Sequence, residues 1–131
     1  KGKHPLRVVI DKDLKIPKTA KIFSDEAQTL VFTAHQTPNF KTTEFCEIDF
    51  DQPILPQLLN ELYNRSIQSL IVEGGQVTLQ AFIDTNLWDE ARVFKSPKQL
   101  KNGTQAPCFK AHLTQTKQIV KDELKYFKPI K

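Results

Sequence analysis

Residues 69–83, SLIVEGGQVTLQAFI, allow few folds, because an apolar run stops at an acid, passes through two glycines and continues in helix-forming residues. A short continuous apolar run is typical of a strand that is covered on both faces of a parallel sheet. The chain has only 4 glycines, and Gly74 and Gly75 are adjacent. We therefore predict a buried strand over QSLIVE (68–73), a glycine turn, and a largely covered helix that begins after Gly75.

The other segments alternate between strand and helix patterns. Apolar, β-branched runs such as PLRVVID and TLVFTA favour strands, and leucines at helical spacing favour a helix over residues 51–66. Asp51 is the predicted cap of that helix, and Pro53 lies near its first turn. Strands are predicted at 5–11, 29–34, 45–50 and 87–97, with two or three antiparallel strands from Pro107 onward.

This order predicts an α/β fold: a mixed sheet, mostly parallel with antiparallel C-terminal strands, flanked by helices. The 131 residues and the apolar content of 39% suit a single domain over residues 1–131. No apolar stretch approaches the ~20 residues of a membrane span. With no signal-like start either, we expect a soluble cytoplasmic protein that makes no membrane contact.

The charge and the cysteines narrow the class of partner. The net charge of +4 is spread over several lysine-containing segments, which indicates either a plain solvated surface or attraction of a phosphorylated small molecule or a nucleic acid. Nucleic-acid binding would bring steep salt dependence and is disfavoured here. Cys46 and Cys108 lie far apart and without zinc spacing, so we expect neither a disulfide framework nor a metal.

The glycine turn is the strongest candidate site. In an open α/β sheet, ligands bind beyond the carboxyl ends of the strands, where amides at a helix N-terminus favour anions. Glycine also lets a ligand approach the main chain, so the turn at Gly75 could hold a pyrophosphate. A turn that is merely tight explains the pair equally well. The complete G-x-G-x-x-G pattern is absent, which disfavours a standard Rossmann site.

Two charged residues extend this hypothesis. Glu73 would repel phosphate, but its carboxylate suits sugar hydroxyls; a capping or salt-bridged glutamate is the plainer alternative. Lys12 follows the first strand and could pair with an adenosine 2′-phosphate, which distinguishes NADPH from NADH by charge. Its loop contains several other lysines, so a solvated side chain is the alternative there.

The sequence contains no motif for the other common kinds of catalytic site. His4, His35 and His112 stand apart from acids and cysteines, and no nucleophile elbow, Walker loop or zinc-deaminase motif occurs. We therefore assign no catalytic residue for proton transfer and no metal ligand.

Three segments, PLRVVIDKDLKIP, SIQSLIVEGGQVTLQAFIDTNLWDEARVFKSPK and NGTQAP, occur in an order and spacing that cover nearly the whole chain. In this respect the chain resembles the reductase domain of the bifunctional riboflavin-biosynthesis deaminase/reductase, which has the fold of dihydrofolate reductase. The resemblance implies NADPH-dependent reduction of 5-amino-6-(5-phosphoribosylamino)uracil to its ribitylamino product, by hydride transfer to the ring-opened ribose C1. A cytoplasmic homodimer is also implied.

The resemblance assigns roles to individual positions. It places the substrate at Glu73, and it places the cofactor near Lys12 and along the glycine turn and the following helix. The implied cofactor-binding residues are Lys12, Gly74, Gly75, Gln76, Val77, Thr78, Leu79, Gln80 and Ala81. Family members often carry a small hydroxyl residue in place of Lys12.

The chain also departs from the family. It begins at KGKHPLRV and lacks the family's earlier strands, with their Ser-Leu-Asp-Gly segment and Gly-x-x-Thr turn. We expect it to be the later part of a reductase domain, inactive alone, with a sheet edge that invites pairing with another chain. The alternative is a non-catalytic nucleotide-binding or assembly module, which NADPH and NADH titrations would distinguish from a reductase.

Overall fold

A computed structural model describes residues 4–130 of the protein. The chain divides into two compact units, Lys1–Ser69 and Leu70–Lys131. Each unit contains one three-stranded sheet, parallel in the first unit and antiparallel in the second.

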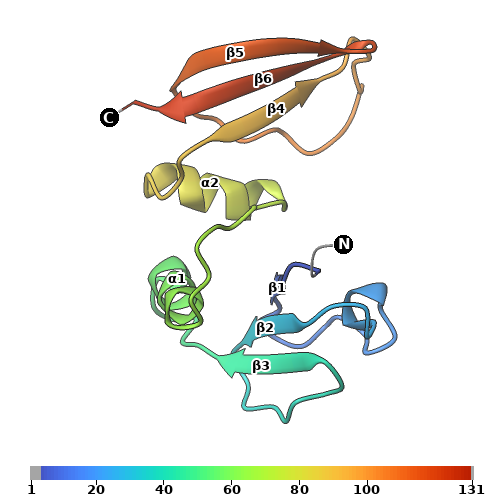
Figure 1. Cartoon of the computed structure of the whole chain (residues 1–131), viewed down its shortest axis with the longest axis vertical. Coiled ribbons are helices and arrows are strands. Elements are labelled where there is room, and N and C mark those ends of the chain that lie inside the picture. The colour runs from blue at the N-terminus through green and yellow to red at the C-terminus, as the bar shows by residue number, and fades with distance from the viewer. Residues whose placement is uncertain (1–3, 131) are drawn as a thin grey trace. The chain divides into compact units, whose positions relative to one another are not determined.

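The first unit is built on a short parallel sheet (Figure 1). Strands β1 (Arg7–Ile10), β2 (Thr29–Thr33) and β3 (Thr43–Glu47) pair in chain order, with Val9 opposite Val31 and Val31 opposite Phe45. A 3₁₀ turn, η1 (Lys21–Phe23), lies in the long connection between β1 and β2. Because the strands are parallel, their carboxyl ends lie at the same edge of the sheet.

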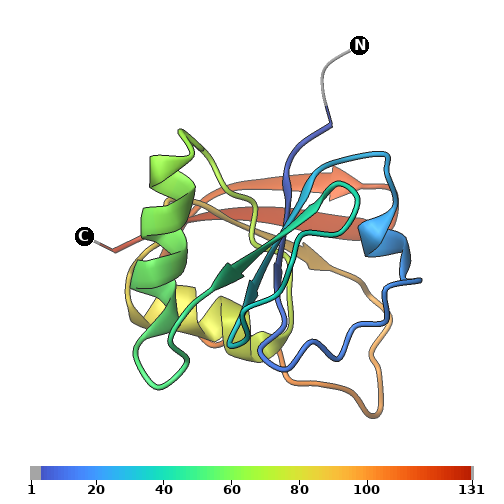
Figure 2. The same ribbon diagram turned by 90° about the horizontal axis from the view of Figure 1, so that it is seen from below.

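The core of the first unit lies between this sheet and helix α1 (Ile54–Asn64) (Figure 2). Leu58 and Leu62 of α1 pack with Leu30 and Phe32 of the central strand β2. The two side chains from β2 are fully buried. Burying an apolar side chain of this size stabilises the fold by ~1.5–3 kcal/mol, so these contacts hold α1 on the sheet.

The second unit contains helix α2 (Gln76–Asp84) and strands β4 (Ala91–Lys95), β5 (Ala111–Ile119) and β6 (Asp122–Pro129). The strands pair in the order β4–β6–β5, and β5 and β6 form a long hairpin (Figure 1). The Phe109 ring meets Trp88 and Phe127 edge-on, at centroid distances of 5.8 and 5.2 Å. These aromatic contacts tie the segment before β5 to the sheet.

The predicted mixed α/β class is confirmed, as are the two helices, the first two strands, β4 and the C-terminal antiparallel pair. The strand predicted over 45–50 lies slightly earlier, at Thr43–Glu47. Pro53, and not Asp51, is the N-cap of α1. The parallel and antiparallel strands belong to two sheets.

The strand predicted over 68–73 is wrong, since residues 67–75 form neither strand nor helix. The boundary between the two units falls inside this run, at Ser69 and Leu70, and Ile71 exposes 84% of its surface. Helix α2 is also less covered than predicted: Phe82 is its one buried residue, and Val77 is 79% exposed.

Candidate functional site

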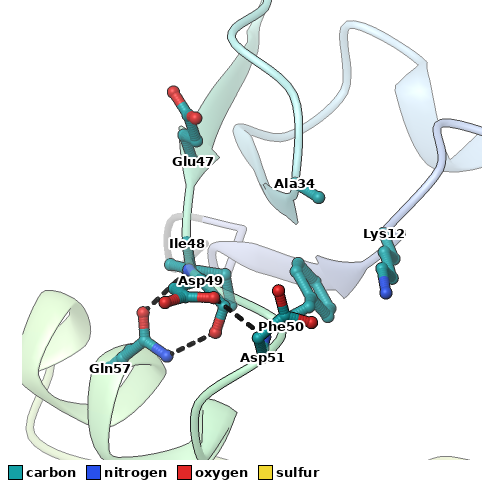
Figure 3. Close-up of a pocket in the computed structure, with 8 residues that line it drawn as sticks. All are labelled: Lys12, Ala34, Glu47, Ile48, Asp49, Phe50, Asp51 and Gln57. Carbon is teal, nitrogen blue, oxygen red and sulfur yellow. Dashed lines mark hydrogen bonds between the residues drawn. The ribbon is translucent and has the colours of Figure 1, made fainter.

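A cavity of about 410 Å³ lies in the first unit at the carboxyl ends of its parallel strands (Figure 3). Lys12 comes from the loop after β1, Ala34 from the end of β2, and Glu47 from the end of β3. The segment between β3 and α1 supplies Asp49, Phe50 and Asp51, and α1 supplies Gln57. This edge is where open α/β sheets bind ligands.

Hydrogen bonds hold the backbone of Lys12 and of the loop in which it lies. Its carbonyl oxygen accepts hydrogen bonds from the Ala34 amide at 3.0 Å and from the Thr33 hydroxyl at 2.9 Å. The buried Asp11 carboxylate accepts the amides of Lys15 and Ile16, both at 2.9 Å. The loop is thereby fixed at its base, and the Lys12 ammonium group lies 5.7 Å from the centre of the Phe50 ring.

Gln57 holds the opposite wall of the cavity. Its side-chain amide donates to the Asp49 carbonyl at 2.8 Å and accepts the Asp49 backbone amide at 2.9 Å, as Figure 3 shows. The Asp49 carboxylate in turn accepts the Asp51 amide at 2.8 Å. These bonds fix the backbone from which Phe50 and Asp51 project.

The charges around this cavity are mixed. Of the described residues that line it, Lys12 is the one cation, while Glu47, Asp49 and Asp51 are acids. In Figure 3 the Glu47 carboxylate points away from the group around Gln57, whereas the Asp51 carboxylate lies beside the Phe50 ring. Such a wall can accept hydrogen bonds from hydroxyl groups, and Lys12 can attract an anion.

The second candidate region is the glycine turn before α2. Gly75 is the N-cap of the helix, with φ −63° and ψ 162°, and no side chain caps the first turn. A Cβ atom at Gly75 would meet nothing within 4 Å, and one at Gly74 would meet Thr78 at an ordinary 3.6 Å. Neither glycine has positive φ, so neither the backbone angles nor crowding within the unit require glycine here. The open main chain remains available for a ligand to approach.

The other predicted residues of this region divide by their contacts. Glu73, the predicted substrate contact, is exposed. The Gln80 side chain is already engaged: it donates to the Cys108 carbonyl and accepts the Cys108 amide, both at 2.9 Å. Gln80 thus holds the segment before β5, and the first turn, Gln76 to Thr78, is the part of α2 suited to an anion.

The predicted residues fall into two candidate regions, one per unit: Lys12 in the first, and Glu73–Ala81 in the second. Sequence reasoning missed Asp49, Asp51 and Gln57. The rule that ligands bind at the carboxyl ends of parallel strands would have indicated the two acids, because they follow β3 directly.

In residues 4–130, no three His, Cys, Asp or Glu side chains lie in an arrangement that could hold a metal ion. None of the helices in this range has the length and apolar character needed to cross a membrane.

Comparisons with known proteins place the chain in a family. The sequence model of the RibD C-terminal domain matches residues 1–126. A 2,5-diamino-6-ribosylamino-4(3H)-pyrimidinone 5′-phosphate reductase from Archaeoglobus fulgidus is 35% identical over 103 residues, which are 74% of this chain and 47% of that protein. The riboflavin biosynthesis protein RibD of Aquifex aeolicus is 33% identical over 107 residues, 77% of this chain and 30% of the relative.

A solved structure agrees in fold. The deaminase/5-amino-6-(5-phosphoribosylamino)uracil reductase of Thermotoga maritima superposes with a TM-score of 0.84 at 23% identity, over 99% of this chain and 39% of that one. The chain therefore belongs to the RibD C-terminal domain family, and the predicted family resemblance is confirmed. It spans about half the length, or less, of the curated relatives described.

Proposed function

We propose that this chain belongs to a reductase that reduces a phosphoribosylaminopyrimidine to its ribitylamino counterpart in riboflavin biosynthesis. The observation that carries this proposal is the match to the RibD C-terminal domain along residues 1–126. The Archaeoglobus relative is named for a diaminopyrimidinone substrate, whereas our sequence-based expectation is the uracil form. The two substrates share the phosphoribosylamino group, so we propose this group as what the site recognises.

The cofactor we propose is a reduced nicotinamide dinucleotide, with NADPH as the form that the resemblance implies. The open amides at Gly75, Gln76 and Val77 fit a pyrophosphate, because Gly75 carries no Cβ and no side chain caps the helix. Lys12 is the candidate contact for a 2′-phosphate. When bound, the nicotinamide supplies the hydride that reduces the ring-opened ribose C1.

The roles left for this chain are binding and orientation. Glu73 lies directly before the turn and would accept hydrogen bonds from ribose hydroxyls, holding the sugar beside the cofactor. No residue in the candidate regions needs to act as a nucleophile or metal ligand for this reaction. We further propose that the protein works as a homodimer.

Replacing Gly75 with serine tests the site. Serine is a good N-cap, and its Cβ would meet nothing within 4 Å, so G75S should leave the stability unchanged or slightly raised. If a pyrophosphate rests on this turn, the added side chain should weaken dinucleotide binding by about tenfold, or ~1.4 kcal/mol. Nicotinamide fluorescence on the whole gene product measures binding, and denaturant unfolding measures stability.

Substrate assays complete the test. The whole gene product is assayed for oxidation of NADPH and NADH with each of the two phosphoribosylaminopyrimidines. Turnover of either substrate supports the proposal. Dinucleotide binding without turnover of either would favour a non-catalytic nucleotide-binding module, and unchanged binding by G75S would exclude the turn as the pyrophosphate site.

A further inference from the structure

The positive charge of the chain is concentrated in the second unit. Of the 19 lysines and arginines and the 15 acids in the sequence, 10 and 6 belong to Leu70–Lys131, whereas Lys1–Ser69 contains 9 of each. The net charge of +4 therefore comes from the second unit alone. Among the described residues of this unit, Arg92 and Lys125 are the two cations that form ion pairs, so most of its lysines have no acidic partner there.

Part of this charge lies on one face of the sheet formed by β4, β6 and β5 (Figure 1). Arg92 of β4 lies opposite Tyr126 of β6 in the register. Phe94 of β4 and Lys117 of β5 lie opposite Leu124, on the two sides of β6. Side chains opposite one another, or two residues apart on a strand, share a face of a sheet. We call the surface formed by Arg92, Phe94, Lys117, Leu124 and Tyr126 the basic face.

Tyr126 holds the two cations of the basic face in place. The Arg92 guanidinium carbon lies 5.5 Å from the centre of the Tyr126 ring, and the Lys117 ammonium nitrogen lies 5.3 Å from it. The ring attracts these charges but presents no carboxylate or carbonyl acceptor to them. Arg92 donates from Nε to Glu90 at 2.8 Å, and its terminal nitrogens have no hydrogen-bond partner among the described residues. Their donors can therefore bind an anion.

The basic face also presents apolar surface. Phe94 is exposed, as are Arg92 and Lys117, while Leu124 at the centre of the face is buried. The one acid that the register places on the same side of β6 is Asp122, at the hairpin end of the strand. An apolar contact with charged groups around it is the arrangement found in interfaces between proteins.

The chemistry of this face favours an acidic protein segment over two other partners. Carboxylates complement a guanidinium and an ammonium group. A single-stranded nucleic acid would stack bases on aromatic rings, but cations already lie over the Tyr126 ring. A second copy packed through the same face would bring Arg92 and Lys117 toward their own counterparts, and like charges oppose such a contact.

We propose that the basic face binds an acidic protein segment, whose carboxylates pair with Arg92 and Lys117 while one of its apolar side chains packs on Phe94. The inference concerns a surface of the second unit alone. It does not depend on the proposed reaction, so its failure would leave the proposed function as it stands.

A defined peptide tests this surface. A short oligo-glutamate with one central phenylalanine is titrated into the whole gene product at low ionic strength and followed by calorimetry. We expect saturable binding that weakens as salt is added, and binding about threefold weaker when the phenylalanine is replaced by glutamate. Absence of saturable binding would overturn the inference. Tighter binding of a thymidine oligonucleotide of the same length would overturn it too, and would indicate a nucleic-acid surface.

Variants assign the binding to individual residues. R92Q and K117Q should each weaken binding of the peptide about threefold, as expected for exposed charge pairs, and the double variant should weaken it about tenfold. Unchanged affinity in both single variants would overturn the inference. Sedimentation of the same variants reports self-association, and a lower oligomeric state would mean that a second copy occupies the face in place of an acidic partner.

Lys95→Gln is the matched control. Lys95 is an exposed cation of the same strand as Arg92, but it lies opposite Glu123 and therefore on the other face of the sheet. K95Q changes the net charge as R92Q does, and it should leave the affinity for the peptide unchanged. An equal loss in K95Q and R92Q would show a general effect of net charge and would overturn the assignment to the basic face.

Discussion

At the scale of single residues, Arg65 of the first unit forms ion pairs with two glutamates. Its guanidinium donates to both carboxylate oxygens of Glu44, at 2.6 and 2.8 Å, and to Glu61 at 2.7 Å. The hydrogen bonds from Arg65 lower the pKa of Glu44 below its ordinary value. Glu44 belongs to β3 and Arg65 follows α1, so this pair joins the helix to the edge of the sheet.

We predict that Glu44→Gln lowers the free energy of unfolding by about 0.5–1 kcal/mol at neutral pH, because a bidentate but half-exposed pair is screened by solvent. A carboxyl whose pKa is lowered by folding stabilises the protein above its unfolded pKa, and this contribution is lost as the pH falls through the folded value. The difference between E44Q and the unaltered protein should therefore shrink in acid. Urea unfolding at neutral and acidic pH measures this difference. Glu26→Gln, which removes an exposed acid of the same unit, is the control. A difference between E44Q and the unaltered protein that stays constant with pH would contradict the pairing.

At the scale of elements, Gln57 connects α1 to the segment that forms the cavity wall. We predict that Gln57→Ala destabilises the protein by about 0.5–1.5 kcal/mol, since it removes two hydrogen bonds to the backbone of the exposed Asp49, whose amide and carbonyl then bind water instead. Asn60→Ala removes an exposed amide side chain from the same helix and should cost far less. Denaturant unfolding compares the two variants, and equal losses would mean that the bonds to Asp49 contribute nothing beyond helix composition.

The elements also show what local sequence can predict. Helix α1 was predictable because its leucines repeat at helical spacing, and three of them, Leu55, Leu58 and Leu62, are buried. The hairpin of β5 and β6 was predictable from its alternation and from the close succession of its strands. The strand predicted over the run SLIVE was wrong, because an apolar run indicates a tendency to be buried but does not identify a neighbouring strand with which it would pair.

The candidate site was predictable only in part, for a similar reason. The glycine turn is contiguous in sequence, and the structure shows an open main chain there. Asp49 and Asp51 meet Lys12 in one cavity only because β1 and β3 are parallel strands that flank β2. That proximity is a property of the sheet and is not written in any short motif.

At the scale of the whole molecule, the buried apolar side chains are unevenly divided between the two units. Among the described residues, the buried hydrophobic side chains of the second unit are Phe82 and Leu124, and all the others belong to the first unit. The large exposed hydrophobic side chains show the reverse distribution. Among the described residues, Tyr63 is the only one of them in the first unit, and the others belong to the second. Phe94, on an edge strand of the second sheet, is 65% exposed. Such a surface favours association with other protein surfaces.

We therefore predict that, in the dilute 131-residue chain, amides of β2 exchange with solvent far more slowly than those of β5, because local stability follows apolar burial. In the whole gene product, where the proposed second subunit can cover apolar surface, β5 and β6 should gain protection. Hydrogen exchange by mass spectrometry measures both, and sedimentation at several concentrations reports the oligomeric state. Protection of β5 equal to that of β2 in the dilute chain would mean that the second unit is stable on its own, and the exposed apolar side chains would then need no partner.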